Sequence, residues 1–268
     1  MRRYLLLPIF LLASACATVP LTGRKQLKLV SNDRIIPMSF TEYEKVLKTT
    51  KLSNDKEQTE MVKRVGVRIQ KSVEIYMAEI GKSHLIRDFK WEFNLLEDGK
   101  TVNAWCMPGG KVAFYTGIMP ICKDEQGVAV VMGHEVAHAI ANHGRERMSQ
   151  TVAAQSSLGI VSVALGGGGS LTLSQEVLLQ GIGLTTQLGL LKFSRKHESE
   201  ADEMGLAFMA MAGYDPAEAP IFWTRMSKLS EGKSPPQFIS THPSHDKRIS
   251  DLNKLVPKVK KKYYRNPK

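Results

Sequence analysis

The feature that most constrains this chain is an apolar segment in which two histidines lie four residues apart. Residues 128–132 read VAVVM, and His134-Glu135-Val136-Ala137-His138 follows directly after Gly133. A four-residue spacing places both imidazoles on one face of a helix. A helix this apolar has little reason to carry two histidines and a glutamate unless they are paired or bind a metal, because burying unpartnered polar groups costs free energy. The sequence therefore predicts a buried helix with a metal site on one face.

The pattern HExxH on a helix is typical of zinc-dependent hydrolases. Two neutral ring nitrogens reach one zinc ion at about 2.0–2.1 Å. Glu135 lies beside them, where it can take a proton from metal-activated water and pass it to a leaving amine. Asp124 and Glu125 suit the first turn of this helix, where negative charge is favourable.

A catalytic zinc site needs a third protein ligand and keeps one position for water. The arrangement HExxHxxGxxH is excluded, because it requires glycine and histidine where this chain has Ala141 and Gly144. His143 lies five residues after His138, about 140° around the helix, so we expect it to be a solvated residue at the helix end.

A second acidic cluster offers the third ligand. A helix is expected from about residue 193 to 212, and Glu198 and Asp202 share one of its faces. One of them could bind the metal while the other accepts the free ring N–H of a ligating histidine. Glu200 points elsewhere on this helix. The alternative is that the cluster is only a charged helix face.

These segments together resemble peptidase family M48, a family of zinc metallopeptidases. The HExxH motif is followed by SRKHESEAD at residues 194–202. Residues 103–117, NAWCMPGGKVAFYTG, resemble the strand–turn–strand that precedes the active-site helix of the family, and THP at 241–243 resembles its C-terminal motif. The secreted lipoprotein members, including bacterial envelope proteases, are expected to be the nearest relatives, rather than multi-spanning members.

Transferred by position, the resemblance implies one Zn²⁺ ion per chain, held by His134, His138 and Glu198. Glu135 would be the general base, and Asp202 would be a partner behind the ligands or a proton donor.

His242 and Arg248 match a pair that lies near the open metal position in relatives. A neutral imidazole there could cap the zinc as a fourth ligand in a resting state, and an N–H-bearing one could stabilise the oxyanion of the transition state. Both alternatives stay open. A plain loop position is a third reading of His242.

The remaining pattern predicts an α+β, zincin-like fold that is mainly helical. Residues 55–80 carry apolar side chains at helical spacing and predict a packing helix. Residues 90–96 alternate in polarity, and residues 102–105 and 112–116 flank a Pro-Gly-Gly turn, so these segments predict a small antiparallel sheet beside the HExxH helix. The edge of such a sheet can hold an extended peptide by main-chain hydrogen bonds.

The beginning of the chain is typical of an export signal. Residues 1–15, MRRYLLLPIFLLASA, have a basic start, an apolar core and small residues before Cys16. Cys16 resembles the lipid-modified cysteine of a bacterial lipobox, although Ala13 stands where leucine is commonest. We therefore expect a protein anchored by a lipid on Cys16 in a bacterial cell envelope. Because Ala17 carries no retention signal, the expected location is the outer membrane, facing the periplasm.

The expected organisation is a signal peptide at 1–15, a lipidated lead-in at 16–54, a metallopeptidase domain at 55–255 and a basic tail at 256–268. Despite the net charge of +11, export and the lack of a recognisable binding motif argue against nucleic acid as a partner. Pairing of Cys106 with Cys122 is left open. The glycine run Gly166–Ser170 is expected to lie in a loop that either moves over the cleft or is a plain linker.

These observations predict a zinc metalloendopeptidase that hydrolyses peptide bonds of misfolded or unassembled envelope proteins. The alternative is a chaperone or assembly factor for envelope proteins, with low or latent protease activity in the same cleft. A purely structural zinc domain is disfavoured, because it would close its site with Cys or His and would have no use for Glu135. Substrate, cut-site preference and oligomeric state are not predicted.

Overall fold

Helices make up most of the structure, a computed structural model that describes residues 16–151, 153, 193–229, 235–242 and 246–265. The expected signal peptide and the loop at Gly166–Ser170 lie outside the described residues. Within the described ranges, no helix is both long and apolar enough to cross a membrane. In the same part of the chain Cys106 and Cys122 are both free thiols.

All strands of the described residues precede residue 116, and helices dominate the rest of the chain. The strands are β1 (Cys16–Thr18), β2 (Lys25–Leu27), β3 (Glu92–Leu96), β4 (Ala104–Met107) and β5 (Lys111–Tyr115). The helices are α2 (Asn32–Thr49), α3 (Lys56–Glu79), α4 (Met119–Cys122), α5 (Glu125–Ile140), α8 (Arg195–Met211), α9 (Glu218–Lys228), α10 (Gln237–Thr241) and α11 (Asp246–Tyr263). Residues 143–151 are also helical.

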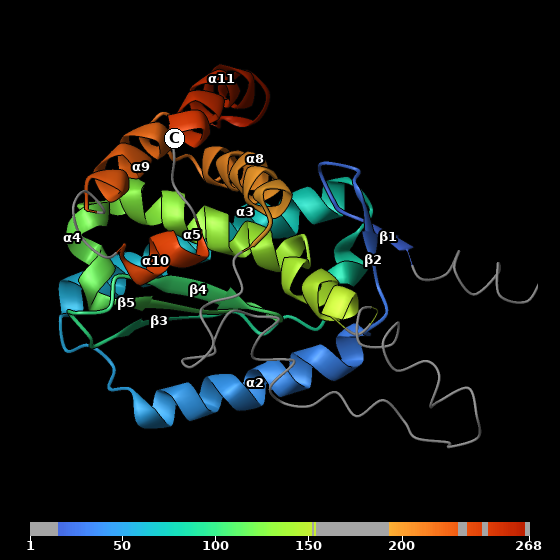
Figure 1. Ribbon diagram of the computed structural model, residues 1–268, viewed down its shortest axis with the longest axis horizontal. Helices are drawn as coiled ribbons and strands as arrows, with labels where there is room; N and C mark the ends of the chain where they lie inside the picture. Colours follow the sequence, from blue (N-terminus) through green and yellow to red (C-terminus); the bar gives the residue numbers. More distant parts are fainter. Residues whose placement is uncertain (1–15, 152, 154–192, 230–234, 243–245, 266–268) are drawn as a thin grey trace, which may run out of the picture.

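Helix α5 runs through the centre of the molecule and carries the HExxH motif. It begins after Asp124, whose carboxylate accepts hydrogen bonds from the backbone N–H groups of Gln126 and Gly127. Every residue from Gly127 to Ile140 is buried. Figure 1 shows the sheet on one side of α5 and helices α8 and α11 on the other. The apolar sequence of this helix is therefore explained by contacts on all its faces.

Helix α8 crosses α5 at two glycines. A Cβ atom placed on Gly133 would lie 2.8 Å from the carbonyl oxygen of Gly205, which is closer than real Cβ contacts allow. The two backbones can approach this closely only because neither residue has a side chain. The crossing lies one residue from His134 and so sets the distance between the motif helix and the acidic side chains of α8.

The sheet beside α5 has the strand order β3-β5-β4. Strands β4 and β5 are antiparallel, as the Pro-Gly-Gly turn predicts, whereas β3 and β5 are parallel. The α+β, mainly helical, zincin-like fold is thus confirmed; the predicted antiparallel pairing holds for β4 and β5 and is wrong for β3. The connection from β3 to β4 passes the end of β5, where the Asp98 N–H donates to the Thr116 hydroxyl and the Gly117 N–H donates to the Asp98 carbonyl. These hydrogen bonds fix the connection across the end of β5, and β5 lies between β3 and β4.

Strand β4 is an edge strand that lies next to α5. Within the described residues it pairs with a strand on one side only. Cys106 of β4 has a pKa raised first by its burial and further by the charge of Glu135, so this strand runs beside the motif. The open edge of the sheet therefore lies next to the predicted site.

The lead-in segment packs against the rest of the chain at two places. Strands β1 and β2 form an antiparallel pair, and Val19 of their connection is fully buried in the main core. Helix α2 covers the face of the sheet opposite α5 (Figure 1), where Tyr43 meets Trp105 edge to face with ring centroids 5.8 Å apart. Both contacts join residues before position 54 to the residues that carry the motifs.

Candidate metal centre

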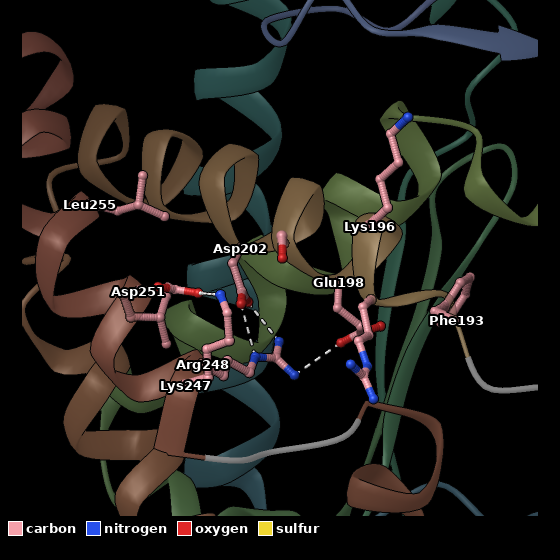
Figure 2. Close-up of a pocket in the computed structure, with 11 residues that line it drawn as sticks. Phe193, Lys196, Glu198, Asp202, Lys247, Arg248, Asp251 and Leu255 are labelled. Carbon is pink, nitrogen blue, oxygen red and sulfur yellow. Dashed lines mark hydrogen bonds and ion pairs between the residues drawn. The ribbon is translucent and has the colours of Figure 1, made fainter.

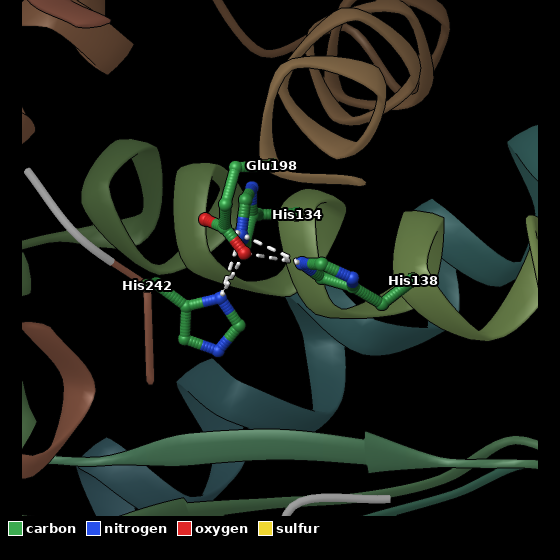
Figure 3. A group of neighbouring side chains, drawn as sticks. All are labelled: His134, His138, Glu198 and His242. Carbon is green, nitrogen blue, oxygen red and sulfur yellow. Dashed lines mark hydrogen bonds and ion pairs between the residues drawn. The ribbon is translucent and has the colours of Figure 1, made fainter. Parts of the chain in front are cut away.

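Four buried side chains from separate parts of the chain converge beside α5. They are His134 and His138 of α5, Glu198 in the first turn of α8, and His242 at the end of α10. Each offers one ligand atom, and these atoms all lie within 4.8 Å of one another. Figure 3 shows the three imidazoles and the carboxylate pointing at a common centre.

The distances between these atoms match a tetrahedral zinc site. The Nε2 atom of His134 lies 3.1 Å from Nε2 of His138 and 3.2 Å from Nδ1 of His242. The Oε1 atom of Glu198 lies 3.4 Å from His138 Nε2 and 3.0 Å from His242 Nδ1. Ligand atoms bound to zinc at 2.0–2.1 Å would stand about 3.3–3.4 Å apart in a regular tetrahedron. The donor set and its spacing are therefore consistent with zinc.

His242 fills the fourth corner of this arrangement. A catalytic zinc site normally leaves that corner to water or substrate. The other ring nitrogen of His242, Nε2, lies 3.4 Å from the Oε1 atom of Glu135. Of the alternatives left open by the sequence, a plain loop position is wrong, because the imidazole points into the site.

Asp202 and Arg248 contact the candidate ligands through atoms that face away from the common centre. The Oδ1 atom of Asp202 lies 3.0 Å from Nδ1 of His134, the nitrogen that faces away from the centre. Arg248 donates to both oxygens of Asp202 at 2.6 and 2.9 Å, and to Oε2 of Glu198 at 2.9 Å. Its guanidinium stacks on Trp223, 3.4 Å from the ring centroid. The planar guanidinium group of Arg248 thus holds both carboxylates in fixed positions.

Arg248 also keeps both carboxylates ionised. Burial raises the pKa of Glu198, but the neighbouring side chains of His242 and Arg248 outweigh burial and hold that pKa well below its ordinary value. Burial likewise raises the pKa of Asp202, and Arg248 and His134 reverse the effect, so the net shift is downward. Ionised carboxylates suit both a metal ligand and an acceptor of a ligand's N–H.

Glu135 has a different environment. It is buried, and in the described part of the chain its Oε1 atom makes no hydrogen bond, although Nε2 of His242 lies 3.4 Å away. Burial raises the pKa of Glu135 to about 7. A carboxylate with such a pKa can accept and release a proton near neutral pH, as a general base must.

Next to the centre lies a pocket of about 470 Å³ whose lining includes Glu198, Asp202 and Arg248. Figure 2 shows the Arg248 guanidinium between the carboxylates of Asp202 and Glu198, which line the pocket together with Lys196 of α8 and Lys247 of α11. The pocket brings solvent space up to the side chains that hold the ligands.

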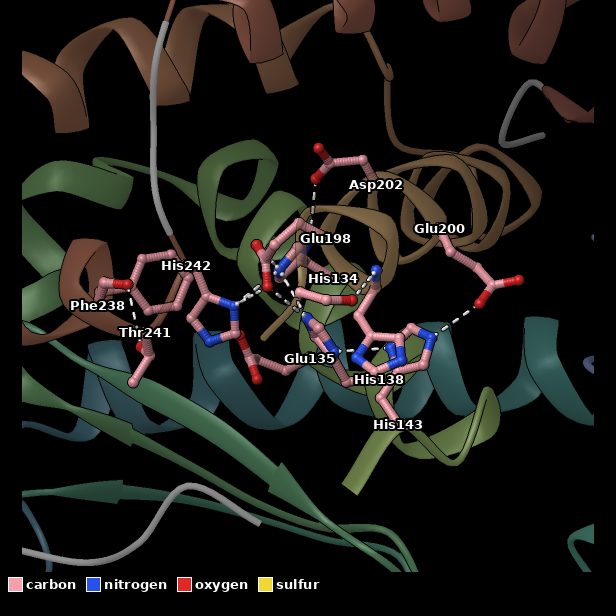
Figure 4. Close-up of polar contacts among 12 residues, drawn as sticks. His134, Glu135, His138, His143, Glu198, Glu200, Asp202, Phe238, Thr241 and His242 are labelled. Carbon is pink, nitrogen blue, oxygen red and sulfur yellow. Dashed lines mark hydrogen bonds and ion pairs between the residues drawn. The ribbon is translucent and has the colours of Figure 1, made fainter. Parts of the chain in front are cut away.

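The expectation that His143 is solvated is wrong. His143 is fully buried, with Nδ1 2.9 Å from Nδ1 of His138 and Nε2 2.9 Å from Oε2 of Glu200 (Figure 4). The angular extrapolation fails because α5 ends at Ile140 and the chain turns at Asn142, whose φ is +56°. A second helix then carries His143 back toward His138.

Sequence reasoning missed the residues that surround His143. Glu200 points away from the metal centre, as expected, but it is buried and bonded to Arg24, which also pairs with Glu146. Glu146 in turn lies 3.1 Å from Nε2 of His197. Glu146 and Arg24 lie 54 and 176 residues before Glu200 in the sequence, so no local pattern connects them to the site.

Comparison with known proteins agrees with these observations. Residues 66–256 match the sequence model of peptidase family M48. The mitochondrial metalloendopeptidase OMA1 of Schizosaccharomyces pombe is 40% identical over 177 residues, which cover 65% of this chain and 49% of that protein. The human mitochondrial metalloendopeptidase OMA1 is 29% identical over 248 residues, which cover 90% of this chain and 46% of that protein.

A bacterial relative matches at lower identity. The beta-barrel assembly-enhancing protease of Yersinia pestis is 28% identical over 172 residues, covering 62% of this chain and 34% of that protein. The expectation placed the secreted lipoprotein members, including bacterial envelope proteases, nearest, whereas the mitochondrial protein of S. pombe is more similar to this chain than the bacterial protein of Y. pestis. The chain spans about half the length, or less, of these curated relatives.

Proposed function

The chain belongs to peptidase family M48, and on that premise we propose that it is a zinc metalloendopeptidase. The observation that carries the proposal is the convergence of His134, His138 and Glu198 beside the buried carboxylate of Glu135. Neither a structural metal site nor a simple binding cleft has a use for a carboxylate whose pKa is raised to about 7. A hydrolase uses such a carboxylate to take a proton from the attacking water.

The chemistry divides between the metal and the chain. When bound, zinc supplies Lewis acidity, which makes water acidic enough to lose a proton near neutral pH and polarises a carbonyl group. Glu135 takes the proton from the attacking water and delivers it to the nitrogen of the departing amine. Asp202 accepts the Nδ1–H of His134 and so keeps Nε2 of that ring unprotonated and directed at the centre.

The open edge of β4 is suited to hold the substrate. An extended peptide can add to this edge through main-chain hydrogen bonds, which depend little on sequence. Because β4 runs beside Glu135, a peptide bound there lies next to the general base. We therefore propose broad specificity for extended or unfolded polypeptides.

For His242 we propose the capping role. Its Nδ1 atom lies among the ligand atoms, 3.2 Å from His134 Nε2, which favours a fourth ligand that excludes water over a donor to an oxyanion. The structure would then represent a resting enzyme that opens when His242 withdraws.

We further propose that the enzyme acts on misfolded or unassembled envelope proteins and is held at the outer membrane, facing the periplasm, by a lipid on Cys16. The support is the export-like pattern of residues 1–15 and the name of the relative from Yersinia pestis, a beta-barrel assembly-enhancing protease. The second candidate function is a chaperone or assembly factor with latent activity. The position of His242 favours it, because a capped site turns over slowly.

The test compares zinc-loaded wild-type protein with Glu135→Gln, using casein and an unfolded outer-membrane protein as substrates. Glu135→Gln should retain zinc and lose about 10²–10⁴-fold in rate, because it keeps the ligands and removes the base. Glu60→Gln, on the exposed face of α3, is the matched control and should cleave like wild type. Equal cleavage by wild type and Glu135→Gln would contradict the mechanism.

His242→Ala decides between the two candidate functions. If His242 caps the site, the variant should cleave faster than wild type at equal zinc content. Slower cleavage at equal zinc content would instead assign His242 to the oxyanion. If wild type and His242→Ala both bind unfolded chains and zinc but cleave nothing, the chaperone hypothesis replaces the protease hypothesis.

A further inference from the structure

The nitrogen of His138 that faces away from the centre has an unusual partner. Ligating histidines generally donate their second ring N–H to a carboxylate, a backbone carbonyl or water, which fixes the orientation of the ring. His134 follows this pattern through Asp202. His138 instead faces another imidazole, that of His143, with 2.9 Å between the two Nδ1 atoms.

The contacts of this pair assign every proton. Nε2 of His138 lies among the ligand atoms and must be unprotonated to bind a metal, so its Nδ1 carries the hydrogen. Nδ1 of His143 must then accept that hydrogen, which leaves the hydrogen of the neutral His143 ring on Nε2. That N–H donates to Oε2 of Glu200 at 2.9 Å. The order of donation therefore runs from His138 to His143 to Glu200.

Glu200, the last acceptor in this series of hydrogen bonds, is bonded to the connection between β1 and β2. Arg24 donates from Nε to Oε2 of Glu200 at 2.6 Å, and the Thr22 hydroxyl donates to Oε1 of the same carboxylate. Arg24 also forms two hydrogen bonds to Glu146, at 2.8 and 2.6 Å. Because Val19 is fully buried in the core beside them, this connection is fixed in place.

We propose that His143 is a positioning residue for the metal ligand His138, and that Arg24 and Thr22 complete its support through Glu200. The proposal rests on the zinc site of the proposed function. It extends that site to residues that precede residue 66, where the family match begins. It also gives the lead-in segment a role in metal binding in addition to its expected role as a tether.

The test measures the zinc affinity of the whole protein by competition with a chromophoric chelator at fixed pH. His143→Leu removes the acceptor for the His138 N–H and should weaken zinc binding about 10–100-fold. His143→Asn should recover much of this loss, because its amide oxygen can lie where Nδ1 lies in histidine. Arg24→Met, which frees Glu200 without touching a histidine, should weaken zinc binding in the same direction by less.

The matched control is Arg64→Met. Arg64 also donates two hydrogen bonds to one carboxylate, that of Glu125, at 2.9 and 2.7 Å, but this pair lies on the surface away from the ligands. It should leave zinc affinity unchanged. Thermal unfolding of each variant without metal separates loss of fold from loss of the site, and the Arg24→Met result keeps the test valid should His143→Leu unfold.

A second readout is the visible spectrum of the cobalt-substituted protein, which reports ligand geometry without any activity. His143→Leu should shift the cobalt bands, and His143→Asn should restore them. Wild-type affinity and wild-type bands in folded His143→Leu would overturn the proposal. This result does not depend on the proposed protease activity. A wild-type protein that binds zinc and cleaves no substrate would still reveal whether its zinc affinity depends on His143.

Discussion

At the scale of single residues, the net pKa shift of a buried carboxylate is upward or downward according to its neighbours. Glu135 has no hydrogen-bond partner at Oε1 in the described part of the chain, and burial raises its pKa to about 7. Glu146 is also buried, but bonds from His197 and Arg24 outweigh burial and lower its pKa to about 2. The first group can exchange protons near neutrality, whereas the second is a permanent anion that holds structure.

Glu146 should make the fold sensitive to acid. Its folded pKa of about 2 lies below its ordinary value of 4.5. Its stabilisation is therefore fully present above about pH 5 and is lost as the pH falls toward 2. The stabilisation is on the order of 3 kcal/mol. Glu146→Gln should remove this part of the pH dependence, as measured by urea unfolding between pH 6 and pH 3.

The control for this prediction is Glu60→Gln, which changes an exposed carboxylate paired with Lys63. It should leave the slope of stability against pH unchanged. If Glu146→Gln shows the wild-type slope, Arg24 and His197 do not hold the carboxylate in solution as they do in the structure.

At the scale of elements, the crossing of α5 and α8 determines whether a site forms. The motif supplies its two histidines from one helix, but Glu198 reaches them only because Gly133 and Gly205 allow backbone contact. Helix packing with ordinary side chains would separate the axes by 8–10 Å. The glycines are therefore as necessary to the geometry as the ligands.

Gly205→Ala should push the two helices apart. Its Cβ would lie 2.9 Å from the backbone nitrogen of His134, and a backbone atom cannot move aside as a side chain can. We expect a loss of about 1–3 kcal/mol in the free energy of unfolding, together with weaker zinc binding. Gly99→Ala is the matched control, because nothing lies within 4 Å of its added carbon. Equal zinc affinity in the two variants would show that the site tolerates a wider crossing.

Some helices and strands could be predicted from the sequence alone, and others could not. The helix at Lys56–Glu79 and the hairpin of β4 and β5 follow local periodicity and turn residues, and both are confirmed. The parallel pairing of β3 depends on where the connection after Leu96 crosses, and the burial of His143 depends on the turn at Asn142. Both are decided by contacts distant in sequence, which periodicity does not encode.

At the scale of the whole molecule, the centre joins parts of the chain that are far apart in sequence. Its ligand atoms come from α5, α8 and the end of α10, Arg248 of α11 bonds Glu198, and the connection of β1 and β2 reaches it through Glu200. An ion bound at this centre links these elements in the folded state. The unfolded chain offers no such preformed set of ligands.

Zinc should therefore stabilise the entire fold, and the stabilisation should grow with the logarithm of the free zinc concentration above the dissociation constant. A ligand that binds only the folded state adds about 4 kcal/mol when present at 1,000 times its dissociation constant. Thermal unfolding should show a midpoint that rises with free zinc and falls on chelation. Glu135→Gln should show the same rise, because Glu135 is not among the converging ligand atoms. His134→Ala should abolish it, because that ring contacts His138, His242 and Asp202 at once. A midpoint that ignores zinc in the wild-type protein would mean that the four side chains do not hold the ion together.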